Sequence, residues 1–270
     1  MVVERKYDVL AIGRSSIDLY AREIGAPFTE IKSFAAYVGG CPTNISVCTQ
    51  RLGLRTALQT ALGEDLVGDF VLKFLEGEGV VTDFSRRKPG RRTSAFLLGI
   101  EPPDHFPLVP YRDNCADLEL TIDDILAAPI AESRVLLITG TGLSRSPSRD
   151  ATIFAAEQAR AHNTKVVLDL DFRAELWPDA RSYGVAMRSI APLVNVVIGT
   201  HDEVVSAFAL TSETNTSSEQ SQTSHINREL WQGIEAMLAF GPEALVMKRG
   251  EKARSFFRAE AKLLRRCPLA

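Results

Sequence analysis

The sequence predicts an α/β fold in which a doubly wound, mostly parallel sheet carries helices on both faces and a small second sheet is appended. Short apolar runs alternate with helical patterns along the chain, as repeated βαβ units require. A chain of 270 residues with 45% hydrophobic content can bury one large core. Two segments with strand-like alternation, 24–38 and 92–111, have no following helix. Their strands must pair elsewhere, which predicts the appended sheet.

The core strands are expected at six apolar runs of strand length. These runs cover residues 9–12, 57–60, 135–139, 166–170, 194–198 and 244–247, and helical patterns follow the glycine pair up to Leu52 and cover 153–162 and 183–191. Strands that read as continuous apolar runs are buried on both faces, so ligands are expected at the carboxyl ends of the strands. The polar segment 212–224 is expected to be a flexible surface insertion.

Charge and cysteine content exclude several classes of protein. A net charge of -3 gives no electrostatic footprint for nucleic acid. The four cysteines form no Cys-x-x-Cys pair, which favours reduced thiols over a disulfide framework or a zinc site. The sequence shows neither a signal peptide nor an 18-residue apolar run. We therefore expect a soluble cytoplasmic protein that binds no membrane and no nucleic acid.

A glycine pair at the start of a helical stretch is the clearest candidate site. Gly39 and Gly40 allow a backbone to approach a ligand closely, and Pro42 suits the first turn of a helix. Asn44 offers a donor and an acceptor to the same opening, as the adjacent hydroxyls of a sugar require. An ordinary strand-to-helix turn explains the glycines alone equally well.

This stretch resembles the N-terminal signature of the ribokinase-like (PfkB-type) carbohydrate kinases. The segments 63–68, 169–177 and 248–250 resemble further motifs of that family in the same order. Segments 99–104 and 111–117 resemble the branch that phosphorylates 5-dehydro-2-deoxygluconate in inositol breakdown. The resemblance implies a kinase domain over 1–252 with a lid over about 14–38 and 92–113, and it implies a homodimer formed through the lid.

The resemblance assigns the acceptor side of a kinase site to the first half of the chain. It implies that sugar hydroxyls are bound by Asp18, Gly39, Gly40 and Asn44. Arg112 and Asn114 would close over the carboxylate of a sugar acid, since a guanidinium holds a carboxylate with two parallel hydrogen bonds. The other interpretation of Arg112 is a surface residue of the lid.

The resemblance assigns ATP and Mg²⁺ to residues that follow later strands. Asp171 is expected to face the ligand and Asp169 to be structural, because two carboxylates aimed at phosphates repel them unless a metal ion lies between. Glu203 would order a water bound to Mg²⁺, although Thr200 and Glu203 also fit a helix capping box. The remaining nucleotide-side residues are Lys248, Arg249 and Arg173, of which Arg173 contacts a phosphate or caps its loop through Asp179.

The family's Gly-Ala-Gly-Asp turn, which carries the catalytic base, does not occur in the 270 residues. Residues 253–270 read as an atypical tail in its place. Loss of an anion hole costs about 10²–10³-fold in rate per donor, and loss of a general base costs about 10²–10⁴-fold. We therefore expect a C-terminally truncated or frame-shifted kinase with impaired activity.

Three alternatives stay open at this point. The chain could be a sugar-binding protein without catalysis, or a kinase of another sugar such as fructose or 2-keto-3-deoxygluconate. An NAD-dependent oxidoreductase is suggested by Gly140 and Gly142 after a strand. It fits less well because the third glycine of that motif falls at Arg145, and the next acidic residue at a strand end, Asp169, comes too late.

Overall fold

The computed structural model describes residues 5–103, 105–209, 228–249, 254–258 and 261–267. The chain divides into two compact units, residues 1–165 and 166–270. The expected insertion at 212–224 lies outside the described residues. Among the helices of the described ranges, none combines the length and the apolar character that a bilayer crossing needs. Cys41, Cys48 and Cys115 carry free thiols.

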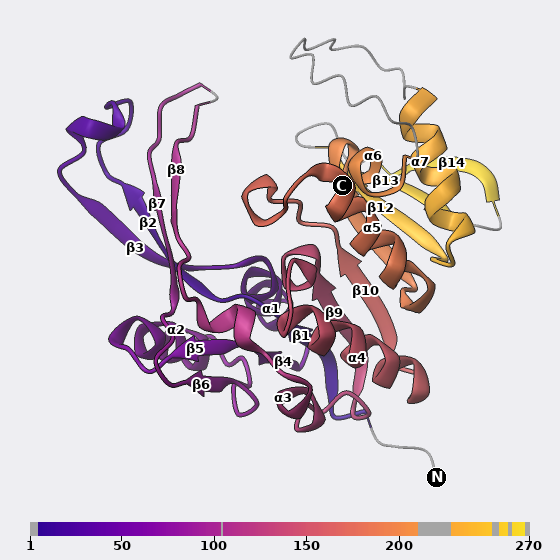
Figure 1. Cartoon of the computed structure of the whole chain (residues 1–270), viewed down its shortest axis with the longest axis horizontal. Coiled ribbons are helices and arrows are strands. Elements are labelled where there is room, and N and C mark those ends of the chain that lie inside the picture. Colours follow the sequence, from indigo (N-terminus) through magenta and orange to yellow (C-terminus); the bar gives the residue numbers. More distant parts are fainter. Residues whose placement is uncertain (1–4, 104, 210–227, 250–253, 259–260, 268–270) are drawn as a thin grey trace. The chain divides into compact units, whose positions relative to one another are not determined.

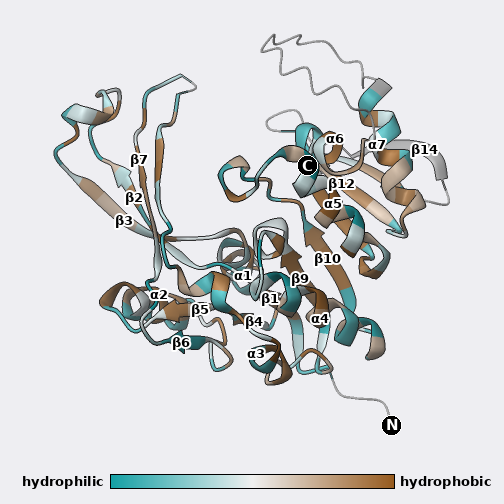
Figure 2. Ribbon diagram, viewed as in Figure 1, coloured by the Kyte–Doolittle hydropathy of each residue, from teal (hydrophilic) through white to brown (hydrophobic). Residues whose placement is uncertain are grey.

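The core of unit 1 is built on three parallel strands. β1 (Tyr7–Ile12) lies between β4 (Thr56–Gln59) and β9 (Ser133–Thr139) and pairs in parallel with both. Figure 2 shows β9 as hydrophobic over most of its length, as expected of a strand buried on both faces. The helices α1 (Cys41–Arg51) and α4 (Ser148–Ala161) pack against these strands.

Shorter elements complete this part of unit 1. They are β5 (Ala61–Gly63), α2 (Leu66–Gly77), β6 (Arg86–Lys88) and α3 (Ile122–Leu126), with 3₁₀ turns η1 (Phe28–Glu30), η2 (Ala116–Glu119) and η3 (Gly140–Leu143). α2 begins at an N-cap carboxylate, because Asp65 accepts hydrogen bonds from the Gly68 N–H at 2.7 Å and the Thr93 N–H at 2.8 Å. These bonds, with a third from the Thr93 hydroxyl, fix the Gly-x-Asp-x-x-Gly turn that the sequence shares with sugar kinases.

Unit 1 also contains a separate four-stranded sheet, which we call the lid after the role predicted for it. Its order is β3-β2-β7-β8, formed by β2 (Ser16–Ala21), β3 (Phe34–Gly39), β7 (Ser94–Leu98) and β8 (Leu108–Tyr111). β2 is antiparallel to β3 and parallel to β7, and β8 is antiparallel to β7. Figure 1 shows these four strands side by side. They lie within the two predicted lid segments, 14–38 and 92–113, except that β3 ends one residue later.

Unit 2 carries a second group of parallel strands with helices. β10 (Lys165–Asp169), β11 (Val196–Thr200) and β12 (Ala244–Lys248) pair in parallel. β13 (Arg254–Arg258) and β14 (Ala261–Cys267) continue from β12 in antiparallel fashion, so strands form within the tail that the sequence marks as atypical. The helices are α5 (Ala180–Ile190), α6 (His201–Phe208) and α7 (Arg228–Ala239), with 3₁₀ turns η4 (Ala174–Leu176) and η5 (Ala191–Leu193). α6 packs against both α5 and α7.

Candidate active site

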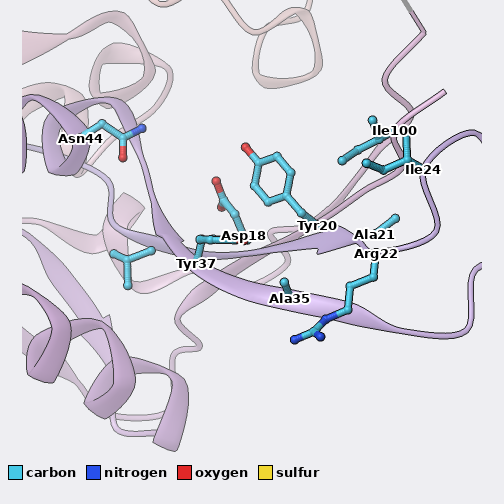
Figure 3. A pocket seen from close by; sticks show the side chains of 10 residues that line it. Asp18, Tyr20, Ala21, Arg22, Ile24, Ala35, Tyr37, Asn44 and Ile100 are labelled. Carbon is cyan, nitrogen blue, oxygen red and sulfur yellow. The ribbon is translucent and has the colours of Figure 1, made fainter. Parts of the chain in front are cut away.

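Unit 1 contains a cavity of about 780 Å³ beside β2 and β3 of the lid. Two of the residues expected to bind the sugar, Asp18 and Asn44, line it together. Figure 3 shows the Asp18 carboxylate with the Tyr20 ring beside it and the Asn44 amide on the neighbouring helix. The full lining consists of Asp18, Tyr20, Ala21, Arg22, Ile24, Ala35, Tyr37, Val38, Asn44 and Ile100.

Local structure explains why Asp18 and Asn44 come together. Asp18 lies in the middle of β2, and its Oδ1 accepts a hydrogen bond from the Ser16 hydroxyl at 2.9 Å. Asn44 lies in the first turn of α1, where its side chain is exposed and its N–H donates to the Gly40 carbonyl at 2.8 Å. A carboxylate and an amide can together accept from and donate to adjacent hydroxyls.

The two glycines between β3 and α1 are required by close contacts. A Cβ atom at Gly39 would lie 2.0 Å from Oδ2 of Asp18, and one at Gly40 would lie 2.3 Å from the Arg14 carbonyl oxygen. Gly40 also has a φ of 107°, which favours glycine. The glycine pair therefore lets the backbone approach the Asp18 carboxylate, and Pro42 follows in the first turn of α1 as the sequence predicts.

Arg112 lies next to the end of β8 with a buried guanidinium group. It forms an ion pair with Asp117 at 2.5 Å, and the two side chains are only 7% and 4% exposed. Its guanidinium carbon lies 6.0 Å from the centre of the Phe96 ring. Within the described residues, Nε and Nη1 are buried without a hydrogen-bond partner. Arg112 is thus no surface residue of the lid, and two of its nitrogens keep unused donors.

Asn114, like Arg112, is not among the residues that line the cavity. Its Nδ2 donates to the Gly90 carbonyl at 2.7 Å, and its Oδ1 accepts from the Arg91 guanidinium. Its φ of 58° fits the turn that follows the lid. Because both ends of the amide are used in this turn, Asn114 supports the loop that carries Arg112.

In unit 2, two of the expected nucleotide-side residues, Lys248 and Glu203, form one charged cluster with Asp169. Lys248 Nζ lies 3.0 Å from Oδ1 of Asp169 and 3.6 Å from Oε2 of Glu203. Burial raises the pKa of the Asp169 carboxyl, and the Lys248 charge opposes that rise. Asp169 is therefore the partner of Lys248, in keeping with the structural role predicted for it. Arg249 Nη1 is 3.5 Å from the Ser255 hydroxyl.

Asp171 has an unusual environment two residues beyond Asp169. It has a φ of 35°, and its side chain is 4% exposed. Its Oδ1 pairs with Arg173 Nη2 at 3.0 Å, whereas its Oδ2 is buried without a hydrogen-bond partner in the described part of the chain. Asp179 instead accepts from the Ser182 N–H as the N-cap of α5 and pairs with Arg181. Arg173 therefore does not cap its loop through Asp179.

Thr200 and Glu203 form the capping box that their spacing predicts. The Thr200 hydroxyl accepts from the Glu203 N–H at 3.3 Å, and the Thr200 N–H donates to Oε2 of Glu203 at 2.7 Å. Oε1 of Glu203 accepts from the Phe172 N–H at 3.2 Å. Glu203 thus joins the start of α6 to the loop after β10. In the described ranges, no group of three or more His, Cys, Asp or Glu side chains is arranged to enclose a metal ion.

Sequence reasoning missed Tyr183 as a member of this region. The Tyr183 hydroxyl donates to the Leu170 carbonyl at 3.1 Å beneath the loop, and its ring packs on Phe172 with centroids 4.5 Å apart. Burial, followed by the charges of Glu203, Asp171 and Asp169, raises the pKa of Tyr183 well above its ordinary value. The only sequence signal was the predicted helix start at Tyr183.

Comparison with known proteins identifies the family. Residues 6–267 match the pfkB family of carbohydrate kinases. The chain belongs to this family. The 5-dehydro-2-deoxygluconokinase of Listeria monocytogenes serovar 1/2a is 38% identical to this chain over 201 residues. The aligned region covers 74% of this chain and 62% of the Listeria protein. The 5-dehydro-2-deoxygluconokinase of Bacillus velezensis is 36% identical over 201 residues, or 74% and 61%. The chain thus spans about 62% of the length of these relatives.

Solved structures of pfkB-type kinases share the fold. The fructokinase of Halothermothrix orenii matches with a TM-score of 0.76 and 27% identity, covering 97% of this chain and 85% of that one. The fructokinase of Xylella fastidiosa with bound ATP matches with a TM-score of 0.79 and 20% identity, covering 97% and 78%. These matches confirm the predicted ribokinase-like α/β fold.

The oxidoreductase alternative is not supported. Gly140–Leu143 forms a 3₁₀ turn after β9, and the next α-helix begins only at Ser148. A dinucleotide-binding turn places its glycines directly at the start of that helix. The local geometry and the family assignment therefore both argue against a dinucleotide-binding turn at Gly140.

Proposed function

We propose that this chain acts on a sugar acid, 5-dehydro-2-deoxygluconate, as the acceptor of a phosphoryl group from ATP. The observation that carries the proposal is the buried Arg112 guanidinium, which has a carboxylate partner on one side and two nitrogens without a hydrogen-bond partner among the described residues. A buried polar donor without a partner costs about 1–3 kcal/mol. A ligand carboxylate that accepts from those nitrogens removes this cost and gains charge-assisted hydrogen bonds. The names of the relatives point to the same acid.

The acceptor-side assignment follows the cavity of unit 1. Asp18 and Asn44 bind hydroxyls of the sugar, and Gly39 and Gly40 leave room for the ligand near the Asp18 carboxylate. A fixed carboxylate that accepts a hydroxyl hydrogen bond orients the sugar for reaction. The proposal leaves Asn114 out of direct contact because its amide is already bonded.

The nucleotide-side assignment rests on the charged groups of unit 2. Lys248 and Arg173 are half-exposed cations suited to phosphate oxygens. The carboxylates of Asp171 and Glu203 are hard oxygen ligands, and the unpartnered Oδ2 of Asp171 fits a Mg²⁺ ion held through water and phosphate. When bound, Mg²⁺ supplies neutralisation of the phosphate charge. Thr200 holds Glu203 in place through the capping box, and Arg249 adds positive charge beside Lys248.

We expect weak turnover from the 270-residue chain, because its sequence contains no Gly-Ala-Gly-Asp motif. In related kinases the base of the reaction is expected from that motif. Sugar-acid binding is therefore the primary test, and turnover is the second. A sugar-binding protein without turnover, and a kinase of fructose or 2-keto-3-deoxygluconate, remain the competing functions.

The proposal also covers the oligomeric state of the protein and its location in the cell. We propose a homodimer through the lid because large apolar side chains of its β7–β8 hairpin, Phe106 and Leu108, are 57% and 46% exposed. We place the protein in the cytoplasm because the reaction consumes ATP. Equilibrium sedimentation of the purified chain checks the dimer, and a single monomeric species would contradict it.

Titration calorimetry tests the function. The chain is titrated with 5-dehydro-2-deoxygluconate, 2-keto-3-deoxygluconate and fructose. We expect the two acids to bind more tightly, and Arg112→Gln to weaken acid binding by about 10- to 100-fold, since a hydrogen bond between charged groups contributes about 1.5–3 kcal/mol. Arg92→Gln, which changes an exposed arginine, is the matched control. Equal losses for acids and fructose would contradict a carboxylate role, and an ADP-coupled assay separates a kinase from a binding protein.

A further inference from the structure

We propose that Tyr20 and Tyr37 form an aromatic platform that packs against the carbon skeleton of the sugar and helps to set acceptor specificity. The inference rests on the proposed function and concerns the same cavity. It adds an apolar half to a site whose other candidate residues are polar, and neither tyrosine stands out in the sequence.

Strand register places the platform beside the polar residues. Tyr37 on β3 is the direct cross-strand partner of Asp18 on β2, and Tyr20 lies two residues beyond Asp18 on the same strand. Side chains two apart, and directly paired side chains, lie on one face of a sheet. Both tyrosines line the cavity together with Asp18 and Asn44, and Figure 3 shows the Tyr20 ring beside the Asp18 carboxylate.

The two rings support one another. Their centroids are 5.4 Å apart and their planes are at 90°, which is the edge-to-face arrangement that aromatic pairs prefer. Because the pair is anchored on two paired strands, the aromatic surface is fixed before any ligand arrives. A preformed surface loses little conformational entropy on binding.

Exposure shows that the pair is not core packing. Tyr37 is 56% exposed and Tyr20 is 36% exposed, although both line a cavity. A sugar carries hydroxyls along its edge and C–H groups on its faces. Ligand cavities commonly combine apolar and aromatic walls with a few polar groups. Asp18 and Asn44 suit the hydroxyls, and the tyrosines suit the C–H groups.

The Tyr20 ring carries no charge at neutral pH. Burial raises the pKa of Tyr20, and the neighbouring Asp18 charge and Tyr37 raise it further, so the phenol stays protonated. An uncharged ring does not distinguish an acid from a neutral sugar. The platform should therefore contribute equally to both, in contrast to Arg112.

Calorimetry on matched variants tests the platform. Tyr37→Leu is expected to weaken binding of 5-dehydro-2-deoxygluconate and of fructose by the same factor, about 3- to 10-fold, the range of one aromatic contact. Tyr37→Phe keeps the ring and should bind both sugars like the unmodified chain. The control is Tyr111→Leu, since Tyr111 is 59% exposed on the opposite face of the lid sheet, paired with Ala95. Melting temperatures are recorded for every variant.

The outcomes separate this inference from the proposed function. Unchanged affinity in Tyr37→Leu, with a lowered melting temperature, would show that the pair only stiffens the lid. A similar loss in Tyr111→Leu would assign the effect to the lid as a whole, and a loss confined to the acid would exclude stacking. Each of these results overturns the platform while sugar binding by the unmodified chain stands. If the unmodified chain binds neither sugar, the proposed function and the platform both fail.

Discussion

The acceptor region of unit 1 and the charged region of unit 2 are built on different physical principles. In unit 1, missing Cβ atoms and aromatic walls shape a cavity around Asp18 and Asn44. In unit 2, charges compensate one another, as Lys248 does for Asp169 and Glu203. Steric changes should therefore abolish acceptor binding outright. Charge changes should alter nucleotide binding gradually and in a salt-dependent way.

Gly39→Ala should have the largest effect. The added Cβ atom would lie 2.0 Å from Oδ2 of Asp18, so either the carboxylate or the backbone must move. Overpacking costs about 1–3 kcal/mol or more, and displacing Asp18 would also remove the hydrogen bonds to the sugar that we propose for it. We expect calorimetric affinity to fall at least about 100-fold. Gly77→Ala is the control because nothing lies within 4 Å of its Cβ position. Retained affinity in Gly39→Ala would show that the steric account of unit 1 is wrong.

Asp18→Ala and Asn44→Ala should each weaken sugar binding by about 1–3 kcal/mol, the cost of leaving a polar partner unmatched. The change removes one hydrogen-bonding group without adding volume, so it is expected to be smaller than that of Gly39→Ala. Titration calorimetry with the sugar acid measures it. An unchanged dissociation constant for either variant would remove that residue from the site.

Asp65→Ala tests the stabilising role of a unit 1 carboxylate that is held mainly by neutral hydrogen-bond donors, in contrast to the ion-paired carboxylates of unit 2. Burial opposes its ionisation, yet hydrogen bonds from Thr93 and Gly68 lower the pKa of Asp65 below its ordinary value of 3.8. Loss of an N-cap should cost about 1 kcal/mol of stability. Since the folded pKa is depressed, this contribution is present above pH 3.8 and is lost as the pH falls through the folded pKa.

Thermal unfolding measures this contribution. At neutral pH the deficit of Asp65→Ala should change little between low and high salt, because backbone N–H donors are not screened as ion pairs are. Below the folded pKa the deficit should vanish. A deficit that grows on acidification would contradict the sign of the pKa shift.

Lys248→Gln should have the smallest effect, on nucleotide binding. Lys248 is 40% exposed, so its attraction to phosphate is screened and contributes about 1 kcal/mol or less. Calorimetry with MgATP at two salt concentrations should show a loss of up to about 5-fold that shrinks at high salt. A salt-independent loss of 100-fold would show that Lys248 is fixed by more than charge.

Strand positions were predictable because apolar runs are a local signal. The run at 244–247 corresponds to β12 (Ala244–Lys248), and the run at 194–198 is displaced by two residues from β11 (Val196–Thr200). α4 begins at Ser148, five residues before the predicted 153, because its first turns bury small residues such as Ala151 that give no apolar periodicity. Small or polar residues at the start of a helix therefore predict its first residue less well than apolar spacing predicts its interior.

The resemblance assigns Asp18 and Asn44 to one sugar site, and both line one cavity in the structure. Their binding of a sugar stays a prediction. The partner of Arg112, Asp117, and the Tyr20–Tyr37 pair were not foreseen. These contacts depend on chain folding and strand register within the lid, and pairing between strands leaves little trace in either strand alone.

The positive φ of Asp171 affects how ligands rank in a melting-temperature screen. Asp171 combines a positive φ with a carboxylate oxygen that is buried without a partner among the described residues, which leaves the ligand-free chain less stable by about 1–3 kcal/mol. A ligand that donates to this oxygen relieves part of that cost in addition to making its own contacts. Melting-temperature screens will then favour compounds that reach Asp171 over equally tight binders of the sugar cavity. Direct measurement of dissociation constants avoids this bias.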